Sequence, residues 1–269
     1  MNEALKNGVF QSIPNERAQR KMDLHVATYN IHKGFSAFNR RMVIHELRDR
    51  LRGLGADIVF LQEVIGRHEQ HANRIHEWPD EPQYEFLADS VWGEFAYGRN
   101  AVYDHGHHGN AILSRFPIVS AENQDVSSHP FESRGVLHCE VRIPRTGLSL
   151  HCLCVHFALV ERGRRQQVKA LIDRIVELVP DDAPLIVAGD FNDWRNRVGH
   201  RLATELGLVE AFRDHRGRPA RSFPSRLPLF RLDRIYVRGF SVHHAEVHHG
   251  HSWSRISDHA MLTARLALD

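Results

Sequence analysis

The most regular feature of the chain is a series of short apolar runs, separated by polar and glycine-containing stretches. Runs of this length that are rich in β-branched residues are typical of buried β-strands. The pattern predicts strands at His25–Tyr29, Asp57–Leu61, Asn110–Ser114, Val136–Val141, Leu148–Val155, Leu185–Ala188, Leu232–Val237, Ser241–Val247 and Ala260–Leu266.

Two stretches repeat their apolar residues with helical spacing instead. The first predicts a helix over roughly residues 41–53. The second predicts a helix over Arg162–Val179, which ends where Pro180 removes a backbone donor. Its apolar face consists of Val168, Leu171, Ile172, Ile175, Val176 and Val179.

Many strands with few helices between them predict packed β-sheets with the helices outside. No internal repeat or linker divides the chain, so residues 23–269 are predicted to form a single domain. Residues 1–22 are polar, without the apolar stretch of a secretory signal, and are predicted to be a partly ordered N-terminal extension. No apolar run reaches the length of about 18 residues that a transmembrane helix needs.

Composition excludes several classes of protein. The 269 residues are 42% hydrophobic and 25% charged, which is unlike a disordered, collagenous or coiled-coil chain. The net charge of +2 is too small to indicate nucleic-acid binding by itself. Cys139, Cys152 and Cys154 lie in apolar runs and are predicted to be buried thiols of a cytoplasmic protein, with a redox pair or a metal site as the alternative.

Chemically useful residues stand where the predicted strands end. Asn30, Glu63 and His156 each follow an apolar run, although any one of them alone would be an ordinary turn or surface residue. Asp190 and Asn192 follow another, in L-I-V-A-G-D-F-N. The pair fits either an Asx turn or a carboxylate and an amide that converge on a phosphate or a metal.

The last third of the chain adds Asp233, in R-L-D-R-I-Y-V, and the dipeptide Asp258-His259, in R-I-S-D-H-A. A carboxylate held beside an imidazole orients the ring and raises its basicity. This pairing is typical of general acid–base catalysis.

Taken in order, these pieces resemble the endonuclease/exonuclease/phosphatase superfamily, which includes DNase I-like nucleases, neutral sphingomyelinases and inositol polyphosphate 5-phosphatases. The resemblance runs from Asn30 to His259 and is specific because L-Q-E-V, G-D-F-N and S-D-H occur together in this order. Further motifs, among them N-I-H-K-G-F, F-A-Y-G-R-N-A-V-Y and A-G-D-F-N-D-W, resemble a bacterial subgroup, the YbhP-like proteins. The resemblance implies a four-layer α/β/β/α sandwich, with two mostly antiparallel sheets packed face to face between outer helices.

The resemblance also implies roles for these residues in Mg²⁺- or Mn²⁺-dependent hydrolysis of a phosphoester. Asn30, Glu63 and Asp258 would bind the metal, since hard oxygen ligands suit these ions. The catalytic residues would be His156, Asp190, Asn192, Asp233 and His259. Asp190 and Asn192 would orient the attacking water, Asp233 would hold His259, and His156 would donate a hydrogen bond to the developing charge. Whether Asp190 or His259 takes the proton stays open.

Further residues are candidates for binding the substrate. His32 and Lys33 follow Asn30 closely, and Asn110 ends a Gly- and His-rich stretch, Arg99–Asn110, that is predicted to be a loop near the cleft. Arg134 and Arg231 are candidates for phosphate contacts, with an ordinary surface role as the alternative for each. Arg221, Arg226 and Arg231 alternate with Phe223 and Phe230, which suits either nucleotide stacking or an anionic lipid head group.

The 21 histidines invite a metal-site interpretation. The late cluster His243, His244, His248, His249 and His251 has no cysteine nearby and is predicted to be a solvated edge strand and loop, not a zinc site. The function favoured is a metal-dependent phosphodiesterase of nuclease type acting on a phosphoester substrate, without an obligate protein partner. A phospholipid- or inositol-phosphate-type phosphoesterase and a non-catalytic scaffold that binds a phosphorylated ligand are the alternatives.

Overall fold

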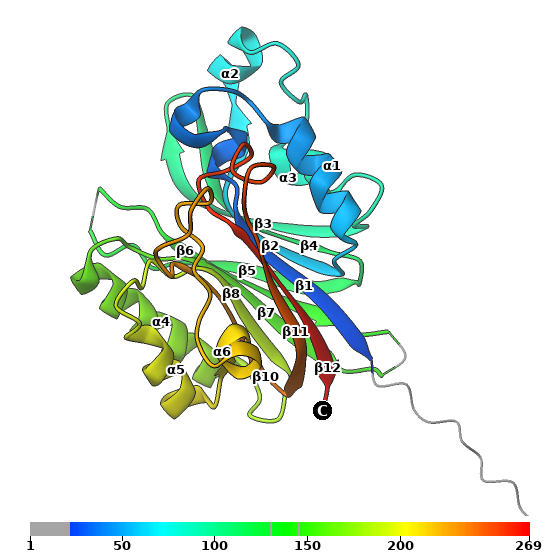
Figure 1. The fold of residues 1–269 in the computed structure, drawn as a ribbon, viewed down its shortest axis with the longest axis vertical. Coiled ribbons are helices and arrows are strands. Elements are labelled where there is room, and N and C mark those ends of the chain that lie inside the picture. The colour runs from blue at the N-terminus through cyan, green and yellow to red at the C-terminus, as the bar shows by residue number, and fades with distance from the viewer. Residues whose placement is uncertain (1–21, 130, 145) are drawn as a thin grey trace, which may run out of the picture.

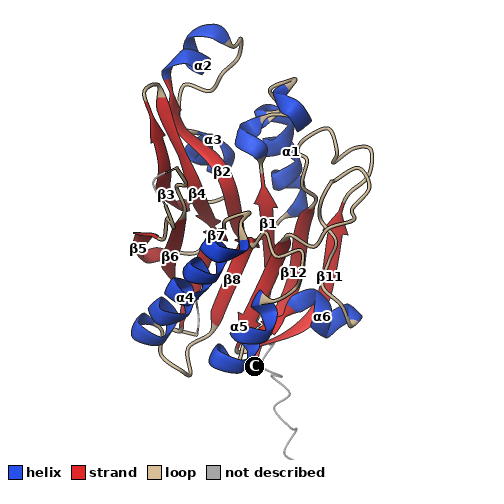
Figure 2. Ribbon diagram, turned by 90° about the vertical axis from the view of Figure 1, so that its left-hand side faces the viewer, coloured by secondary structure: helices blue, strands red, loops and turns tan. Residues whose placement is uncertain are grey.

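The protein consists of two six-stranded β-sheets packed face to face, with helices on both outer sides (Figures 1 and 2). The structure is a computed structural model that describes residues 22–129, 131–144 and 146–269. The four-layer α/β/β/α sandwich implied by the resemblance is therefore confirmed. The predicted extension, residues 1–22, lies outside the described residues except for Met22.

The first sheet has the strand order β11-β12-β1-β2-β4-β3. Its strands are β1 (Asp23–Asn30), β2 (Ile58–His68), β3 (Glu94–Tyr103), β4 (Gly106–Ser114), β11 (Phe240–His248) and β12 (Met261–Leu268). The second sheet has the order β5-β6-β7-β8-β10-β9. Its strands are β5 (Ile118–Asp125), β6 (Gly135–Arg142), β7 (Ser149–His156), β8 (Leu185–Asp190), β9 (Val209–Glu210) and β10 (Asp233–Arg238).

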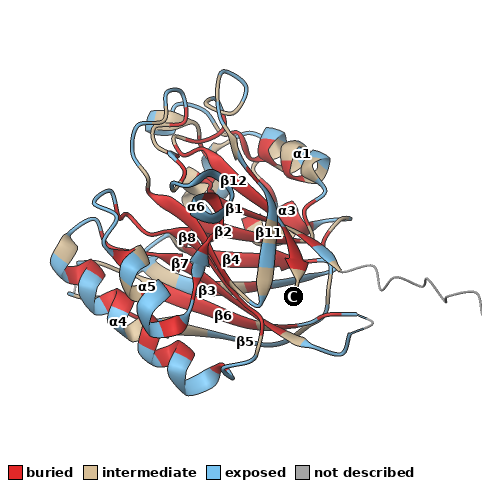
Figure 3. Ribbon diagram, turned by 60° about the horizontal axis from the view of Figure 1, so that its bottom comes forward, coloured by how far each residue is buried: buried red, intermediate tan, exposed pale blue. Residues whose placement is uncertain are grey.

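The helices cover the outer faces of the sheets. They are α1 (Ile44–Leu54), α2 (Glu69–Arg74), α3 (Gln83–Ala88), α4 (Glu161–Leu178), α5 (Val198–Leu206) and α6 (Ala211–Arg216), with short 3₁₀ turns at His32–Gly34 and Ala37–Asn39. Among the described residues, none of these helices combines the length and the apolar character needed to cross a membrane. The exposed faces of α4 and α5 contrast with the buried strands beneath them in Figure 3.

Each sheet contains one parallel pair of strands, and the remaining pairs are antiparallel. β1 pairs with β2, and β7 pairs with β8. A helix connects the two members of each pair, α1 in the first case and α4 in the second. Because parallel strands end at the same edge, Asn30 lies beside Gln62 in one sheet and His156 lies beside Asp190 in the other.

Alternating side chains of these strands fill separate layers of core. Val26, Phe60, Cys152 and Ile186 belong to the core between the sheets. Their chain neighbours pack outward, against α1 and α3 on one side and against α4 and α5 on the other. The three cysteines are free and buried, as predicted, and Cys152 and Cys154 share the inner face.

One prediction about a segment was wrong. Arg99–Asn110 is not a loop, because β3 and β4 continue through it and form a hairpin in which Gly98 pairs with Asn110. The polar and glycine-rich composition of the hairpin conceals its strands, since much of β3 is exposed and offers no apolar run to recognise. The histidine-rich segment near residue 245 forms β11, an edge strand, as predicted.

His138, on the outer face of the second sheet, is expected to make stability pH-dependent. It is 8% exposed, its Nε2 lies 3.0 Å from Nδ1 of His151, and burial together with Arg174 lowers its pKa to about 4. As the pH falls from 6.5 to 4, the unfolded chain binds a proton that the folded chain does not. The free energy of unfolding should therefore fall, by an amount of the order of 2 kcal/mol.

Urea unfolding of wild type and His138→Gln at pH 7, 6, 5 and 4 measures this contribution. The variant should lose less stability than the wild type over this range. The control His76→Gln removes a side chain that is 94% exposed and should follow the wild type. A His138→Gln variant with the same pH dependence as the wild type would show that His138 is not the group responsible.

Candidate active site

The candidate active site lies where the carboxyl ends of the two parallel pairs meet across the sandwich. Asn30 and Glu63 come from β1 and β2 of the first sheet, and His156 and Asp190 come from β7 and β8 of the second. Asn30 joins the sheets, since its Nδ2 donates to Oε1 of Glu63 at 3.4 Å and to Oδ2 of Asp190 at 3.3 Å. Residues that are far apart in the sequence thus share one buried cluster.

Asp190 is the centre of this cluster. Its Oδ2 lies 3.6 Å from Nε2 of His156 and 3.8 Å from Nε2 of His259. Its other oxygen, Oδ1, accepts a hydrogen bond from the backbone N–H of Asn192 at 2.9 Å, which is the predicted Asx geometry. The Asx turn and the convergent carboxylate therefore occur together, and one does not exclude the other.

Gly189 explains how Asp190 can reach this place. A Cβ at residue 189 would lie 2.0 Å from the carbonyl oxygen of Val155, and the backbone φ is +147°. The strand therefore runs on through Gly189 and ends at Asp190, beyond the predicted end at Ala188. Only glycine allows β8 to approach β7 this closely here.

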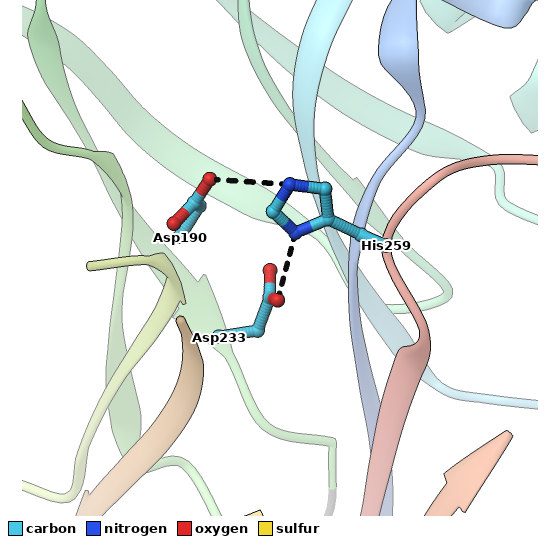
Figure 4. Close-up of side chains that lie close together, drawn as sticks. All are labelled: Asp190, Asp233 and His259. Carbon is cyan, nitrogen blue, oxygen red and sulfur yellow. Dashed lines mark hydrogen bonds and ion pairs between the residues drawn. The ribbon is translucent and has the colours of Figure 1, made fainter. Parts of the chain in front are cut away.

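His259 is held by Asp233, as the sequence suggested. Nδ1 of His259 lies 2.9 Å from Oδ2 of Asp233, and the opposite nitrogen faces Asp190 (Figure 4). Asp233 begins β10 directly opposite Asp190 on β8. The imidazole is thus placed between two buried carboxylates.

Ser257 supports this arrangement and was not recognised in the sequence. Its Oγ donates to the backbone carbonyl of Asn30 at 2.7 Å and accepts from the backbone N–H of His259 at 3.2 Å. The serine therefore fixes the segment before β12 against the end of β1. Its place in the tripeptide S-D-H, directly before the Asp–His pair, is the signal that could have found it.

Glu63 stands on a strained backbone in the middle of β2. Its φ is +56°, and the register of β2 against β4 shifts between Leu61 and Val64. A bulge of this kind turns a side chain out of the regular alternation of a strand. Glu63 is thus turned toward Asn30, and it does not end its strand as the sequence pattern predicted, since β2 continues to His68.

Electrostatics in the cluster follow from burial among opposite charges. Burial opposes protonation of His259, but Asp233 and Asp190 outweigh it and raise the pKa of His259 to about 10. Burial and the neighbouring Asp233 raise the pKa of Asp190 to about 6, although His259 acts against them. The pair therefore places a protonated imidazole beside a carboxylate that titrates near neutral pH.

On the other side of the cluster, the pKa values of His156 and Glu63 are both lowered. Burial and Arg134 lower the pKa of His156 to about 3, so that it is a neutral imidazole at pH 7. Burial opposes ionisation of Glu63, but the side chains around it, with His156, Lys33 and His32 as the largest contributors, outweigh burial and lower the pKa of Glu63 to about 2. Glu63 is thus a carboxylate throughout the physiological pH range.

A comparison with protein families agrees with this geometry. Residues 27–259 match the sequence profile of the Endonuclease/Exonuclease/phosphatase family. The chain belongs to this family. It is also 53% identical over 243 residues to the YbhP protein of Escherichia coli K12, a match that covers 90% of this chain and 96% of that protein.

Solved structures with the same fold act on different phosphoesters. The Bacteroides thetaiotaomicron mannosyl-6-phosphatase Bt3783 is similar with a TM-score of 0.68 at 17% identity and covers 91% of this chain and 100% of its own. The structure of D. rerio TDP2 complexed with a single-strand DNA product is similar with a TM-score of 0.67 at 19% identity. The match covers 91% of this chain and 98% of the TDP2 chain. At these identities the likeness concerns the fold alone.

Enzymes of the family generally hydrolyse phosphoester bonds and use divalent metals. The donor set of this chain fits such an ion, because the carboxylates of Glu63 and Asp190 both lie at the side-chain amide of Asn30 and supply hard oxygen ligands. The amide oxygen of Asn30 accepts a hydrogen bond from the backbone N–H of His32. Ligand atoms of Asp190, Asp233 and His259 also lie within 4.8 Å of one another. Oδ1 of Asp233 is buried without a hydrogen-bond partner, so this carboxylate keeps a free acceptor.

The predicted ligand Asp258 lies at the rim of the cluster. Its Oδ1 is 3.5 Å from Nδ1 of His32, and its side chain is 27% exposed. Lys33 follows His32 in the 3₁₀ turn after β1, and its charge lowers the pKa of Glu63. His32 and Lys33 both have positive φ, in the turn that follows β1. The structure therefore brings these three residues to the mouth of the site.

The other predicted substrate-binding residues differ in position. Arg134 lies close enough to His156 and His108 to lower the pKa of both. Asn110 is fully buried, and its Nδ2 donates to the carbonyls of Gly135 and Cys154, so this amide group ties strands together below the cluster. Nε of Arg231 donates to the carbonyl of Pro219, away from the carboxylates.

A hollow beside this cluster was not visible in the sequence. It has a volume of about 560 Å³ and reaches His259 and Asn192. The rest of its lining is apolar and comes from Leu159, Trp194, Phe223, Phe230 and Leu232. Phe223 packs on His259 with ring centroids 5.0 Å apart. This hollow offers room for a substituent next to the imidazole.

Proposed function

We propose that this protein is a divalent-metal-dependent phosphodiesterase. The observation that carries the proposal is the position of Asp190, whose carboxylate is shared by Asn30, His156 and His259 at the ends of strands from both sheets. Carboxylates, a neutral imidazole and a protonated imidazole within one cluster supply what in-line phosphoester hydrolysis needs.

The roles of the residues follow from their partners. Asp190 and Asn192 would orient the attacking water, and its proton would pass between Asp190 and His259, which face each other. Asp233 would keep His259 in position through the Nδ1 contact. His156, neutral and buried, would donate a hydrogen bond to a non-bridging oxygen of the phosphate.

Asn30, Glu63 and Asp258 are the residues that would hold Mg²⁺ or Mn²⁺. The bound ion would neutralise charge on the phosphate as it develops. We do not assign a metal ion to the group formed by Asp190, Asp233 and His259, because both nitrogens of His259 already face carboxylates. We propose that the contact between Asp233 and His259 serves proton transfer. His32, Lys33 and Arg134 would contact the phosphate from the mouth of the site.

A diester is favoured over a monoester because of the hollow beside His259. Its apolar lining gives a second ester substituent a place to bind while the phosphate lies at the cluster. Among similar folds, the DNA product bound to TDP2 supports a nucleic acid as a substrate to assay, and Bt3783 supports a sugar phosphate. A cytoplasmic location and the absence of an obligate protein partner stay predictions.

A substrate panel tests the proposal. We expect Mg²⁺- or Mn²⁺-dependent cleavage of bis(p-nitrophenyl) phosphate at a rate at least about tenfold above that of p-nitrophenyl phosphate, because the monoester leaves the hollow empty. Single-stranded DNA, RNA, inositol phosphates and phospholipid vesicles complete the panel. Preferential turnover of monoesters would contradict the assignment as a phosphodiesterase, and His259→Asn serves as the inactive reference.

A further inference from the structure

The loop between α6 and β10 carries a local excess of positive charge. Residues 217–232 contain Arg218, Arg221, Arg226 and Arg231 but no Asp or Glu, in a chain whose net charge is only +2. None of these four guanidinium groups takes part in an ion pair within the part of the chain that the structure describes. In Figure 1 the loop is the yellow-to-orange segment between α6 and β10.

The tip of this loop is apolar and faces solvent. Backbone hydrogen bonds between Phe223 and Phe230 close the loop, at 2.8 Å from N of Phe230 and 3.2 Å from N of Phe223. Between them Leu227 is 68% exposed and Leu229 is 53% exposed. A backbone that is fixed by its own hydrogen bonds thus presents two leucines to water. Such exposure is typical of a binding surface when the apolar groups are contiguous.

Two other segments extend the apolar surface around the mouth of the site. Leu159 and Val160 precede α4 and are more than half exposed, and Trp194 follows β8 with 47% exposure. The hollow beside His259 connects the segments, because Leu159, Trp194 and Phe230 all line it. We call these side chains the apolar rim, which consists of Leu159, Val160, Trp194, Leu227, Leu229 and Phe230.

The rim also has positive charge on its α4 side. Glu161, the first residue of α4, is paired with Arg165, Arg195 and Arg197. One carboxylate thus faces three guanidinium groups, which leaves an excess of positive charge next to Val160 and Trp194. Arginines therefore accompany the exposed apolar side chains both at the start of α4 and in the loop between α6 and β10.

We propose that the apolar rim and the arginine loop dock this protein on the surface of an anionic phospholipid membrane, where the phosphodiester of a lipid head group reaches the catalytic cluster. This inference rests on the proposed phosphodiesterase function and names its substrate class. Exposed leucine and valine side chains insert among acyl chains, and the arginines pair with lipid phosphates.

A nucleic acid fits the same surface less well. Single-stranded DNA or RNA is bound by aromatic side chains on which bases stack, within a basic groove. The rim offers Trp194 and Phe230 for stacking, but its most exposed members, Leu227 and Val160, are aliphatic and have no π-face. Burying these side chains requires an apolar partner, which the acyl region of a membrane supplies.

Vesicle flotation with the full-length protein tests the proposal. The probes are vesicles of phosphatidylcholine alone and of phosphatidylcholine with phosphatidylglycerol, each with and without Mg²⁺. We expect binding that depends on phosphatidylglycerol. Arg221→Gln with Arg226→Gln should weaken it by about fivefold for each arginine. Leu227→Ser with Leu229→Ser should weaken it by at least about tenfold.

The matched controls lie elsewhere on the molecule. Val176→Ser removes a valine on α4 that is 68% exposed, and Arg115→Gln removes an exposed arginine beyond β4, at the opposite end of the sandwich. Both should bind vesicles like the wild type. All variants should cleave bis(p-nitrophenyl) phosphate at the wild-type rate, because none of the changed side chains belongs to the cluster or its hollow. This assay therefore separates the docking surface from the chemistry.

Three results would overturn the proposal while leaving the phosphodiesterase function intact. These are wild-type protein that does not float with anionic vesicles, loop variants that float as well as the wild type, and loop variants that lose binding to single-stranded oligonucleotides while vesicles are not bound. The phosphodiesterase function itself fails separately, if the wild type cleaves no phosphodiester in the presence of Mg²⁺ or Mn²⁺.

Discussion

Replacing Asp190 by Asn should reduce the rate of phosphodiester cleavage by at least about 10³-fold. The amide keeps the size of the side chain but removes the charge that faces His156 and His259 and that binds the backbone of Asn192. The effect should be large because the proposed water orientation and proton transfer both depend on this carboxylate. Steady-state kinetics on bis(p-nitrophenyl) phosphate measure the effect.

The same variant should fold normally. Burial raises the pKa of Asp190 from its ordinary value to about 6, which means that ionisation of this carboxyl is less favourable in the folded protein than in the unfolded chain. Removing that charge should leave the melting temperature unchanged or raise it, as is common for strained catalytic groups. Asp182→Asn, which changes an exposed carboxylate before the same strand, is the matched control and should keep full activity. A D190N protein that is folded and active would exclude Asp190 from the chemistry.

Replacing Glu63 by Gln should raise the Mg²⁺ or Mn²⁺ concentration needed for half-maximal activity by at least about 10- to 100-fold. Glu63 is held as a carboxylate by the cationic groups around it, and the bulge in β2 turns it toward Asn30. An amide of the same size keeps one ligand oxygen but loses the negative charge that attracts a hard cation. At saturating metal the variant should recover much of its rate. Glu177→Gln on the exposed face of α4 is the control.

The sequence pointed to several residues that the structure brings together in this candidate site, and it did so for a physical reason. A strand that is buried on both faces reads as a continuous apolar run, so the first polar residue after it marks the edge of the sheet. This rule located Asn30, His156 and Asp190 directly. It could not show that Asn30 would connect Glu63 to Asp190, because that contact depends on how the two sheets pack.

Other features of the fold and of the site could not be predicted from the sequence, for different physical reasons. β3 and β5 are largely exposed, so packing did not select an apolar pattern that periodicity could detect. The bulge at Glu63 and the close approach of Gly189 to β7 are features of the backbone. The residues around them resemble those of an ordinary turn, so the sequence does not reveal either feature. Ser257 acts through hydrogen bonds of its hydroxyl to the backbone of two segments, and the only sign of this in the sequence is its position directly before Asp258-His259.

The orientation of long side chains also could not be predicted from the sequence. Arg134 and Arg231 were equivalent candidates for phosphate contacts, yet only the charge of Arg134 acts on His156 and lowers its pKa. Arg231 is turned to the carbonyl of Pro219 and belongs to the arginine loop. The choice between base stacking and a lipid head group, which residue types left open, depends on the exposed fractions of Leu227 and Leu229. Those values are a property of the folded loop.

We expect a divalent cation, held on the Glu63 side of the cluster, to support phosphodiester cleavage. The most direct measurement is the rate of bis(p-nitrophenyl) phosphate cleavage by protein freed of metal with EDTA, as Mg²⁺ or Mn²⁺ is returned, for wild type and Glu63→Gln in parallel. We predict no activity before addition, full recovery in the wild type, and a curve displaced to higher metal concentration in the variant. Activity that survives complete removal of metal, or two curves that coincide, would contradict this account.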